Sequence, residues 1–537
     1  MNGDISLADT ADPRVDSCTP TPAAVLAPRA TWLRWVLPSI TDILFIALIA
    51  VFAFSPLSAL LLNDADTGWH IRDGELILAT HTVPRVDSFS YTHAGQPWVA
   101  WEWLFEVALA AVHHYAGLNG VVLLTVIIVA TTFSLLFRFL WRRSGNPVVA
   151  IFLTVLALSA SRIHLLARPH VAGWLFMVLW VEALYLFEEG KRYALCWLPP
   201  LMLVWVNTHG SFFLGLVLIV LFGCARAWEF QFNRCAENWR KLKDLAIAFC
   251  ACLGVTLVTP FGINLYVYVY HFLSSSYVMN LIGEFQSPNF HWALLVYFEL
   301  FLLLLGLGLA IARERITSTD CLLILFGVHV GLYAVRSVAV SAILMSFAMA
   351  PMLVGAIQAR QDQPKWLHNA AVRCQAIAQD MMAIEQRCRG HFLAVVVVII
   401  SVAIALHGGR VASAQVMSAH FSEKKFPVKA VEFMESAGIH DHFFNREEWS
   451  GYLIYKLYPE GAKVFTDDRF DFYGEDFIKE VQTSTIGGEH WQVPLDKYQV
   501  KWVVIMKEIP LASLLHENKA WRLRYDDGLA VIYERVQ

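Results

Sequence analysis

Acidic side chains are concentrated in one short stretch of the chain, residues 62–103, between two long apolar runs. Asp64 and Asp66 stand one residue apart, so their carboxylates point the same way if the segment is extended. Such a pair can bind a divalent cation, Mg²⁺ or Mn²⁺, or can supply a general base. The same pattern is typical of a loop that caps a helix, so the pair alone leaves these alternatives open.

Two further acids, Asp87 and Glu102, lie in the same stretch together with four tryptophans. From Trp98 onward, apolar residues recur at helical spacing, which predicts a helix lying in the membrane interface. Tryptophans at this level form an interfacial belt, and in a sugar site they stack on sugar rings. The sequence leaves both roles open for Trp69, Trp98, Trp101 and Trp103.

Arginines at the outer ends of apolar runs are candidates for holding a phosphate, because the guanidinium fork matches phosphate oxygens. They could instead extend to lipid headgroups. The arginines in question are Arg162, Arg168 and Arg336, with Arg72 in the acidic stretch. Four further polar candidates are His70, His170, His209 and Glu284. The histidines could ligate a metal, but no HExxH-type spacing supports that role.

The composition shows what kind of protein must position these groups. Of the 537 residues, 57% are hydrophobic and only 16% are charged, and the mean hydropathy is +0.51. A soluble domain is about 45–50% apolar and about 25% charged, so the chain is a polytopic α-helical membrane protein. The net charge of -4 gives no indication of a nucleic-acid partner, and no Walker loop or dinucleotide fingerprint is present.

About eleven apolar runs are candidates for membrane spans, which need about 20 residues each. Lysine and arginine are concentrated in alternate loops, and residues 260–291 contain neither. Basic loops stay in the cytoplasm, which predicts a cytoplasmic N-terminus and, with an odd number of spans, an external C-terminus. The predicted spans are 38–62, 117–140, 147–163, 170–187, 193–207, 210–228, 244–260, 291–312, 319–335, 337–357 and 392–407.

Three parts of the chain differ in composition. Residues 1–35 are polar and predict a disordered cytoplasmic tail, 36–411 form the transmembrane domain with a first outer loop at 63–116, and 412–537 predict a periplasmic α/β domain. In that last part we expect a helix at 427–437, strands at 451–455, 463–465 and 501–505, and a hairpin at 521–535. Its runs 448–452 and 464–474, dense in acids and aromatics, predict either surface turns or an acceptor-binding patch.

These motifs resemble the GT-C superfamily of membrane glycosyltransferases, whose signature is an acidic motif in the first outer loop. Asp64-Ala65-Asp66 stands in that place. Nearly the whole chain is similar to a bacterial GT-C-like subfamily, and more distantly to protein mannosyltransferases, lipid A aminoarabinose transferase and oligosaccharyltransferases. Residues 449–452 lack the second tryptophan and the aspartate of the oligosaccharyltransferase Trp-Trp-Asp-Tyr-Gly motif, so recognition of a protein sequon is not implied. The runs that carry the resemblance are 66–72, 84–91, 102–104, 168–170, 205–210, 260–262, 451–453 and 467–474.

The resemblance implies a GT-C-like enzyme of the bacterial inner membrane that transfers a sugar, with inversion, from a polyprenyl-phosphate donor to a glycan, lipid or protein. On this interpretation Asp66 has the central catalytic role, Asp64, Asp87 and Glu102 assist it, and the four arginines hold the phosphate. Asp64 and Asp66 would hold any divalent cation. The alternatives are an oligosaccharyltransferase or polysaccharide ligase with a lipid-diphosphate donor, and a non-catalytic scaffold of a polysaccharide assembly system.

Overall fold

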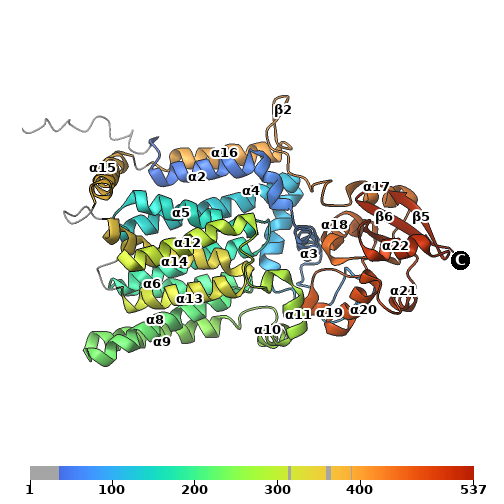
Figure 1. Ribbon diagram of the computed structural model, residues 1–537, viewed down its shortest axis with the longest axis horizontal. Coiled ribbons are helices and arrows are strands. Elements are labelled where there is room, and N and C mark those ends of the chain that lie inside the picture. The colour runs from blue at the N-terminus through green and yellow to red at the C-terminus, as the bar shows by residue number, and fades with distance from the viewer. Residues whose placement is uncertain (1–35, 312–315, 358–363, 389, 537) are drawn as a thin grey trace, which may run out of the picture.

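A bundle of long helices forms one end of the molecule, and a smaller mixed region forms the other (Figure 1). The computed structural model describes residues 36–311, 316–357, 364–388 and 390–536. The predicted tail, 1–35, and the basic loop residues Arg313, Arg315 and Arg360 lie outside the described residues.

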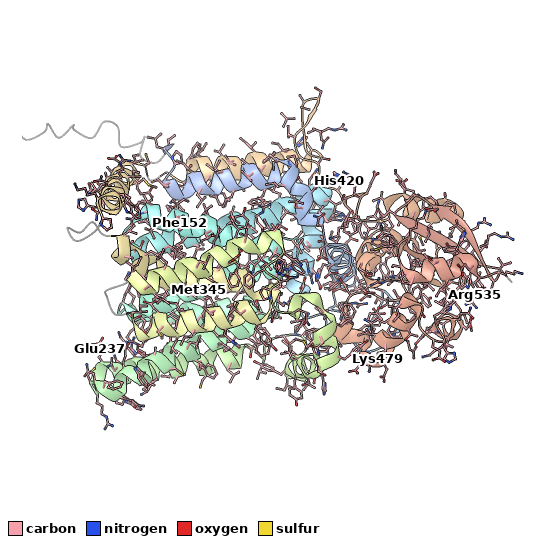
Figure 2. The ribbon with its side chains drawn as sticks, viewed as in Figure 1. Phe152, Glu237, Met345, His420, Lys479 and Arg535 are labelled. Carbon is pink, nitrogen blue, oxygen red and sulfur yellow. The ribbon has the colours of Figure 1, made fainter. Side chains whose placement is uncertain are left out.

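The bundle helices run roughly alongside one another in Figure 1. Their apolar side chains are buried between helices, as at Met345, or face outward, as at Phe152, which is 52% exposed (Figure 2). The elements are α2 (Ile40–Ala53), η1 (Pro56–Leu62), α4 (Trp103–Ser144), α5 (Pro147–Ser161), η2 (Arg162–His164), α6 (His170–Glu188), η3 (Arg192–Trp197), α7 (Leu198–Val206), α8 (Phe212–Phe232), α9 (Ala236–Val255), α12 (Val296–Ile311), α13 (Ser318–Tyr333), α14 (Val338–Ile357) and α16 (Phe392–Leu406).

Among the described residues, six helices are long and apolar enough to cross a membrane, or seven if the bent pair α2 and η1 counts as one span. Three further predicted spans coincide with shorter apolar helices, at 192–206, 318–333 and 392–406. The predicted span 244–260 falls in α9, whose first turns are charged. The chain is therefore a helical membrane protein, but the count of eleven spans is not confirmed.

Local sequence signals explain where several of these helices begin and bend. The side chain of Asn146 accepts hydrogen bonds from the backbone N–H groups of Val148 and Val149, and Pro147 occupies the first position of α5. Gly117 bends α4 with a positive φ of 57°, a conformation that glycine adopts readily. The helix predicted from Trp98 begins instead at Trp103.

Short elements outside the bundle cover its outer end. From the first outer loop comes α3 (Asp66–Thr80), and from the loop after α9 come α10 (Asn264–Ser274), α11 (Ser276–Leu281), η4 (Gly283–Phe285) and η5 (Ala293–Leu295). The turn η6 (Val335–Ser337) precedes α14. In Figure 1, α3, α10 and α11 lie between the bundle and the C-terminal region.

The C-terminal region is built around a four-stranded sheet of order β3-β4-β6-β5, in which β3 and β4 are parallel and the other pairs antiparallel. Its elements are β1 (Arg410–Val411), β2 (Ala414–Gln415), α17 (Val428–Ala437), β3 (Phe443–Asn445), α18 (Glu447–Leu457), η7 (Tyr458–Glu460), α19 (Phe470–Tyr473), α20 (Glu475–Ile486), α21 (Gln492–Lys497), β4 (Trp502–Met506), α22 (Pro510–Glu517), β5 (Trp521–Asp526) and β6 (Ala530–Arg535).

The helix at 427–437, the strand at 501–505 and the hairpin at 521–535 are confirmed. The strand predicted at 451–455 is wrong, because these residues lie within α18. Trp449, Tyr452 and Leu453 are all buried there, at helical spacing, and a five-residue apolar run cannot distinguish helix from strand. At 463–465 the structure has a single isolated bridge, between Ser90 and Val464.

Candidate active site

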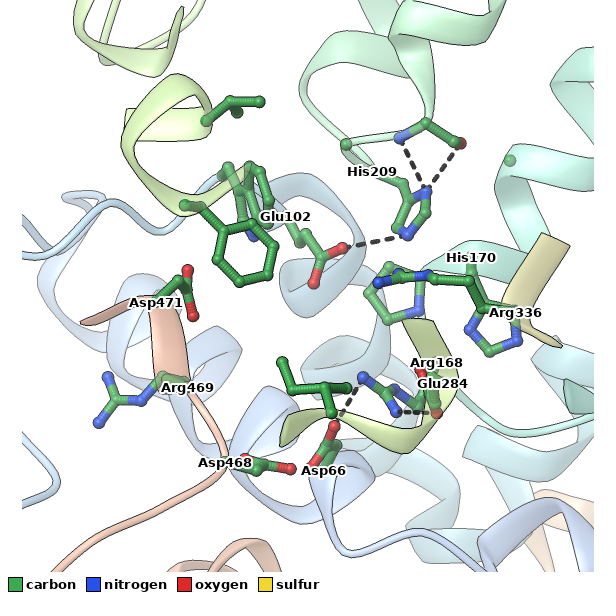
Figure 3. Close-up of a pocket in the computed structure, with 18 of the residues that line it drawn as sticks. Asp66, Glu102, Arg168, His170, His209, Glu284, Arg336, Asp468, Arg469 and Asp471 are labelled. Carbon is green, nitrogen blue, oxygen red and sulfur yellow. Dashed lines mark hydrogen bonds and ion pairs between the residues drawn. The ribbon is translucent and has the colours of Figure 1, made fainter. Parts of the chain in front are cut away.

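The polar candidates converge on a cavity of about 350 Å³ between the bundle and the C-terminal region (Figure 3). Its walls come from α3, the start of α4, the connection that leads into α6, the connection between α7 and α8, α10, the turns η4 and η6, and the segment leading into α19. The charged and titratable side chains that line it are Asp66, Glu102, Glu106, His164, Arg168, His170, His209, Glu284, Arg336, Asp468, Arg469 and Asp471.

Arg168 is the cation around which the acids gather. Its Nη1 lies 3.0 Å from Asp64 Oδ2 and 3.6 Å from Glu284 Oε1, and its Nη2 lies 2.7 Å from Asp66 Oδ2. Burial alone would lower the pKa of Arg168, but Asp64, Glu284 and Glu102 outweigh burial and raise it. Arg168 is therefore a fixed charge whose donors are largely taken by carboxylates.

Asp468 joins Asp64 and Asp66 in a cluster whose carboxylate oxygens lie within 4.8 Å of one another. Burial and the charge of Asp64 raise the pKa of Asp468 to about 8. Oδ1 of Asp66 and Oδ1 of Asp468 are buried, with no hydrogen-bond partner among the described residues. Three convergent carboxylates with two unused buried oxygens are a donor set that fits a hard divalent cation.

Glu102 ends the first outer loop, directly before α4, and its carboxyl group points into the cavity (Figure 3). Its Oε1 lies 3.5 Å from His209 Nε2 and its Oε2 lies 3.8 Å from His70 Nε2. Burial raises the pKa of Glu102 to about 7, although Arg168 and Arg336 act in the opposite direction. A carboxyl group with a pKa near neutrality can act as a general acid or base.

The histidines are held by single, specific contacts. His70 Nδ1 lies 2.9 Å from Glu106 Oε1, His209 Nδ1 lies 2.7 Å from Ser211 Oγ, and His170 Nε2 donates to the carbonyl oxygen of His164 over 2.6 Å. Burial lowers the pKa of His70 and of His209, so both rings are neutral. The only metal-binding group of three side chains in the described part of the chain is the aspartate cluster, and we assign no metal to the histidines.

Arg336 also lines the cavity, and its guanidinium group packs over an aromatic ring. No other described residue makes an ion pair or a hydrogen bond with its guanidinium group, which lies 4.5 Å from the centre of the Phe285 ring. Beside it, burial would raise the pKa of Glu284, but Arg168, His164 and Arg336 outweigh burial and lower it to about 2. Glu284 is therefore an anion, and Arg336 is the guanidinium group most available to an incoming anion.

Three residues predicted for the site lie elsewhere. Arg162 is exposed and does not line the cavity. The guanidinium group of Arg72 donates to the carbonyl oxygen of Tyr455 and pairs with Glu75, so it joins α3 to α18. Asp87 is 3% exposed and outside the cavity, where it accepts hydrogen bonds from the backbone N–H groups of its own turn, at Phe89 and Ser90.

Sequence reasoning assigned no site role to Asp73, Glu106, Asp468, Arg469 or Asp471. The signal for the last three was the acidic, aromatic run 464–474, whose role remained open between a surface turn and a binding patch. Arg469 Nη2 lies 2.6 Å from both Asp467 Oδ2 and Asp87 Oδ1. The buried contact between Arg469 and Asp87 joins the C-terminal region to the first outer loop. It helps to hold residues 468–471 at the cavity.

No protein-family model matches the chain, and no curated protein does. Several solved structures are similar to it, and two of them illustrate the likeness. One is ArnT from Cupriavidus metallidurans bound to undecaprenyl phosphate, at 13% identity over 92% of this chain and 98% of that chain, with a TM-score of 0.48. The other is the Archaeoglobus fulgidus oligosaccharyltransferase in the apo form, at 12% identity over 93% of this chain and 74% of that chain, with a TM-score of 0.49.

Both neighbours belong to the GT-C superfamily, which the motifs of the sequence resemble. Because both TM-scores lie below 0.5, neither neighbour assigns a substrate or a mechanism to this chain.

Proposed function

We propose that the protein is a membrane glycosyltransferase that moves a sugar from a polyprenyl-phosphate donor to a hydroxyl acceptor at the outer face of the membrane. One observation carries the proposal: Arg336, whose guanidinium group has no ion-pair partner among the described residues, and Glu102, whose carboxyl group has a pKa near 7, line the same cavity. Sugar transfer from a phosphate needs positive charge at the departing phosphate and a base at the attacking hydroxyl.

The reaction is a single displacement at the anomeric carbon of the sugar. The acceptor oxygen forms the new bond to that carbon, the bond from that carbon to the phosphate oxygen breaks, and its electron pair leaves with the phosphate. Arg336, with Arg168 beside it, stabilises the negative charge on the phosphate, and a carboxylate takes the hydroxyl proton. Attack on the face opposite the phosphate inverts the anomeric configuration.

Two carboxylates are candidates for the base. Asp66 was predicted from the sequence for the central catalytic role, and its Oδ1 is free, but its Oδ2 is held by Arg168. Glu102 makes no contact that short with a cation, and burial keeps its pKa near that of an effective base. We assign proton transfer to Glu102, and to Asp66 the positioning of Arg168 and the binding of a cation.

A divalent cation, Mg²⁺ or Mn²⁺, would be held by Asp64, Asp66 and Asp468. When bound, such an ion supplies positive charge beside the donor phosphate. It would also relieve the repulsion among three carboxylates that lie so close together. The unused oxygens of Asp66 and Asp468 support this assignment.

We place the protein in the bacterial inner membrane with its N-terminus in the cytoplasm and residues 412–537 in the periplasm. The distribution of Lys and Arg among the loops supports this orientation. The cavity then lies at the outer end of the helix bundle, where a lipid-linked donor can enter. The acceptor would be a glycan, a lipid or a protein.

The experiment compares membranes from cells that lack the protein, that produce it, and that produce the Glu102→Gln variant. Mass spectrometry follows the pool of polyprenyl-phosphate sugars and the sugars attached to envelope glycans, lipids and proteins. We expect one donor lipid to be consumed, and one envelope product to appear, only with the unmodified protein. Identical donor pools and envelope sugars in all three samples would contradict the proposal. Consumption of a diphosphate donor would favour the ligase alternative, and donor binding without release of polyprenyl phosphate would favour the scaffold.

A further inference from the structure

Behind Glu102, a chain of buried polar side chains lies between α3 and α4. His70 is 1% exposed, and its two ring nitrogens face two different carboxyl groups. Nε2 lies 3.8 Å from Glu102 Oε2, and Nδ1 lies 2.9 Å from Glu106 Oε1. The ring therefore connects two glutamates of the cavity wall, Glu102 and Glu106.

Glu106 in turn meets Asp73, and both are almost completely buried, at 1% and 0% exposed. The two carboxyl groups lie against each other, close enough for a hydrogen bond once one of them carries a proton. Yet both oxygens of Asp73, and Oε2 of Glu106, lack any N–H or O–H donor from another described residue. A bond between two carboxyl groups needs a proton on one of them, because two buried carboxylates in contact cannot both ionise. Burial also raises the pKa of Asp73, to about 6. Asp73 and Glu106 thus share one proton.

The hydrogen bond to Glu106 determines which nitrogen of His70 carries hydrogen. The ring is neutral, since burial lowers the pKa of His70, so only one of its nitrogens is protonated. Glu106 Oε1 accepts from Nδ1–H, and Nε2 then presents a lone pair to Glu102. A lone pair repels the carboxylate form of Glu102 and accepts a hydrogen bond from its carboxylic acid form.

We propose that Asp73, Glu106 and His70 are positioning residues that together set the protonation state that Glu102 presents to the cavity. The proton shared by Asp73 and Glu106 holds the pair in place, Glu106 fixes the tautomer of His70, and His70 acts on Glu102. The importance of this chain for sugar transfer rests on the proposed function, in which Glu102 is the base.

Other charged groups also face Glu102, and they do not depend on this chain. Arg168 and Arg336 favour its carboxylate form, and Asp471 opposes that form. His209 lies on its other oxygen, at 3.5 Å. Substitutions at Glu106 leave all four in place. Leu and Gln at position 106 both remove the direct charge interaction between Glu106 and Glu102, so a comparison of the two variants isolates the contribution of His70.

The test is a pH titration of the full-length protein in lipid nanodiscs, followed by infrared spectroscopy of protonated carboxyl groups. The titrating probe is the proton itself, so no sugar donor is needed. The Glu102 band is the one that Glu102→Gln removes. Glu106→Leu removes the acceptor at Nδ1 and frees His70 to donate from Nε2 to Glu102. We expect the Glu102 midpoint to fall by about one pH unit or more, since a hydrogen bond to the charged form favours that form.

Two variants serve as controls. Glu106→Gln keeps an acceptor at Nδ1, because the amide oxygen replaces the carboxyl oxygen, so the Glu102 midpoint should stay within a few tenths of a unit of the unmodified value. Glu75→Leu removes a glutamate of α3 that lies 3.0 Å from the Nδ1 of another histidine, His113, away from the cavity. It should leave the Glu102 midpoint unchanged.

An unchanged midpoint in Glu106→Leu, or equal shifts in Glu106→Leu and Glu106→Gln, would overturn the proposal. If Glu106→Leu does not fold, nitrogen-15 NMR of the unmodified protein decides the matter. The His70 signal, assigned by its loss in His70→Asn, must show hydrogen on Nδ1, and hydrogen on Nε2 would overturn the proposal. Neither measurement involves sugar transfer, so the outcome is separate from that of the envelope experiment.

Discussion

Gly68 on α3 and Gly451 on α18 lie against each other so closely that neither position can carry a side chain. A Cβ atom on Gly68 would overlap the carbonyl oxygen of Gly451, and one on Gly451 would overlap the carbonyl oxygen of Ala65. The first outer loop and the C-terminal region therefore meet backbone to backbone, within the first helical turn around Asp66. The site depends on that contact, because Asp66 comes from one side of it and Asp468 from the other.

The first prediction is that Gly451→Val separates α18 from α3. The added atoms would meet backbone, which cannot move aside as a side chain can, and overpacking of this kind costs about 1–3 kcal/mol. We expect a lower midpoint of thermal unfolding and faster hydrogen exchange in α3 and α18. Gly223→Ala is the control, since a Cβ there has open space within α8. A Gly451→Val protein as stable as the Gly223→Ala protein would show that the contact is not needed.

The second prediction concerns the donor phosphate. Arg336 lines the cavity and has no partner among the described side chains, so Arg336→Gln should remove a charged hydrogen bond to the phosphate, worth about 1.5–3 kcal/mol. We expect affinity for polyprenyl phosphate, measured by native mass spectrometry in nanodiscs, to fall about tenfold or more. Arg162→Gln, at an exposed position outside the cavity, should bind like the unmodified protein. Equal affinities in all three proteins would remove Arg336 from the phosphate site.

Residues at the outer ends of apolar runs were predictable from sequence, because an ionisable group beside a membrane span is rare unless it has a role. Arg168, Glu284 and Arg336 were found in this way, and the structure brings them together at the cavity. Arg72 and Asp87 have the same kind of sequence context but are used for packing. Residue type and position in the chain cannot separate the two uses, since both depend on the partner that tertiary folding supplies.

The residues that sequence reasoning missed depend on contacts between distant segments. Asp468 reaches the aspartate cluster beside a contact between distant segments, in which Arg469 pairs with Asp87, far away in the chain. Glu106 lies one helical turn after Glu102, which the sequence shows, but its carboxyl group meets Asp73 only where α4 packs on α3. In the same way, α18 buries one helical face against α3. The five-residue apolar run 451–455 does not reveal that contact, so the sequence alone did not identify the helix.

The third prediction is the pH dependence of transfer. Burial raises the pKa of Glu102 to about 7, so below that pH the group is protonated and cannot accept the hydroxyl proton. The turnover number for donor consumption should rise with pH up to about 7 and then level off. Glu102→Gln should reduce turnover by about 10²–10⁴. The pKa of Glu284 is about 2, so Glu284 is ionised throughout this pH range. A rate that stays constant from about pH 5 to 8 would therefore indicate that the base is a carboxylate with a low pKa and not Glu102.

The fourth prediction concerns orientation in the membrane. The distribution of basic residues predicts a cytoplasmic N-terminus and an external C-terminus. A reporter that is active only in the periplasm, fused after the last residue, should therefore be active. A reporter that is active only in the cytoplasm is the matched control and should be silent at the same position. The reverse result would place the cavity on the cytoplasmic side and exclude a donor from the outer leaflet.

The last prediction separates the roles open to Asp66. The sequence allowed the Asp66 carboxylate to cap the helix that follows it, and the structure does not show such a cap. Asp66 is the first residue of α3. Ala65, the residue before it, makes no side-chain cap, and the backbone N–H of Asp66 donates to Asp64 Oδ1. The Asp66 carboxylate instead faces Arg168 and the cavity. Helix stability should therefore survive Asp66→Asn, while the charge at the aspartate cluster is lost.

We expect the Asp66→Asn protein to fold and to lose most of its affinity for Mn²⁺, which electron paramagnetic resonance of the full-length protein measures directly. Loss of one carboxylate ligand from a site of this kind should weaken binding by at least about tenfold. Sugar transfer should fall with it, because Asp66 also positions Arg168. Asp244→Asn, which changes an acid paired with Arg192 away from the cavity, should alter neither quantity. A protein with Asn at position 66 that binds Mn²⁺ and transfers sugar like the unmodified one would leave Asp66 with only its contact to Arg168.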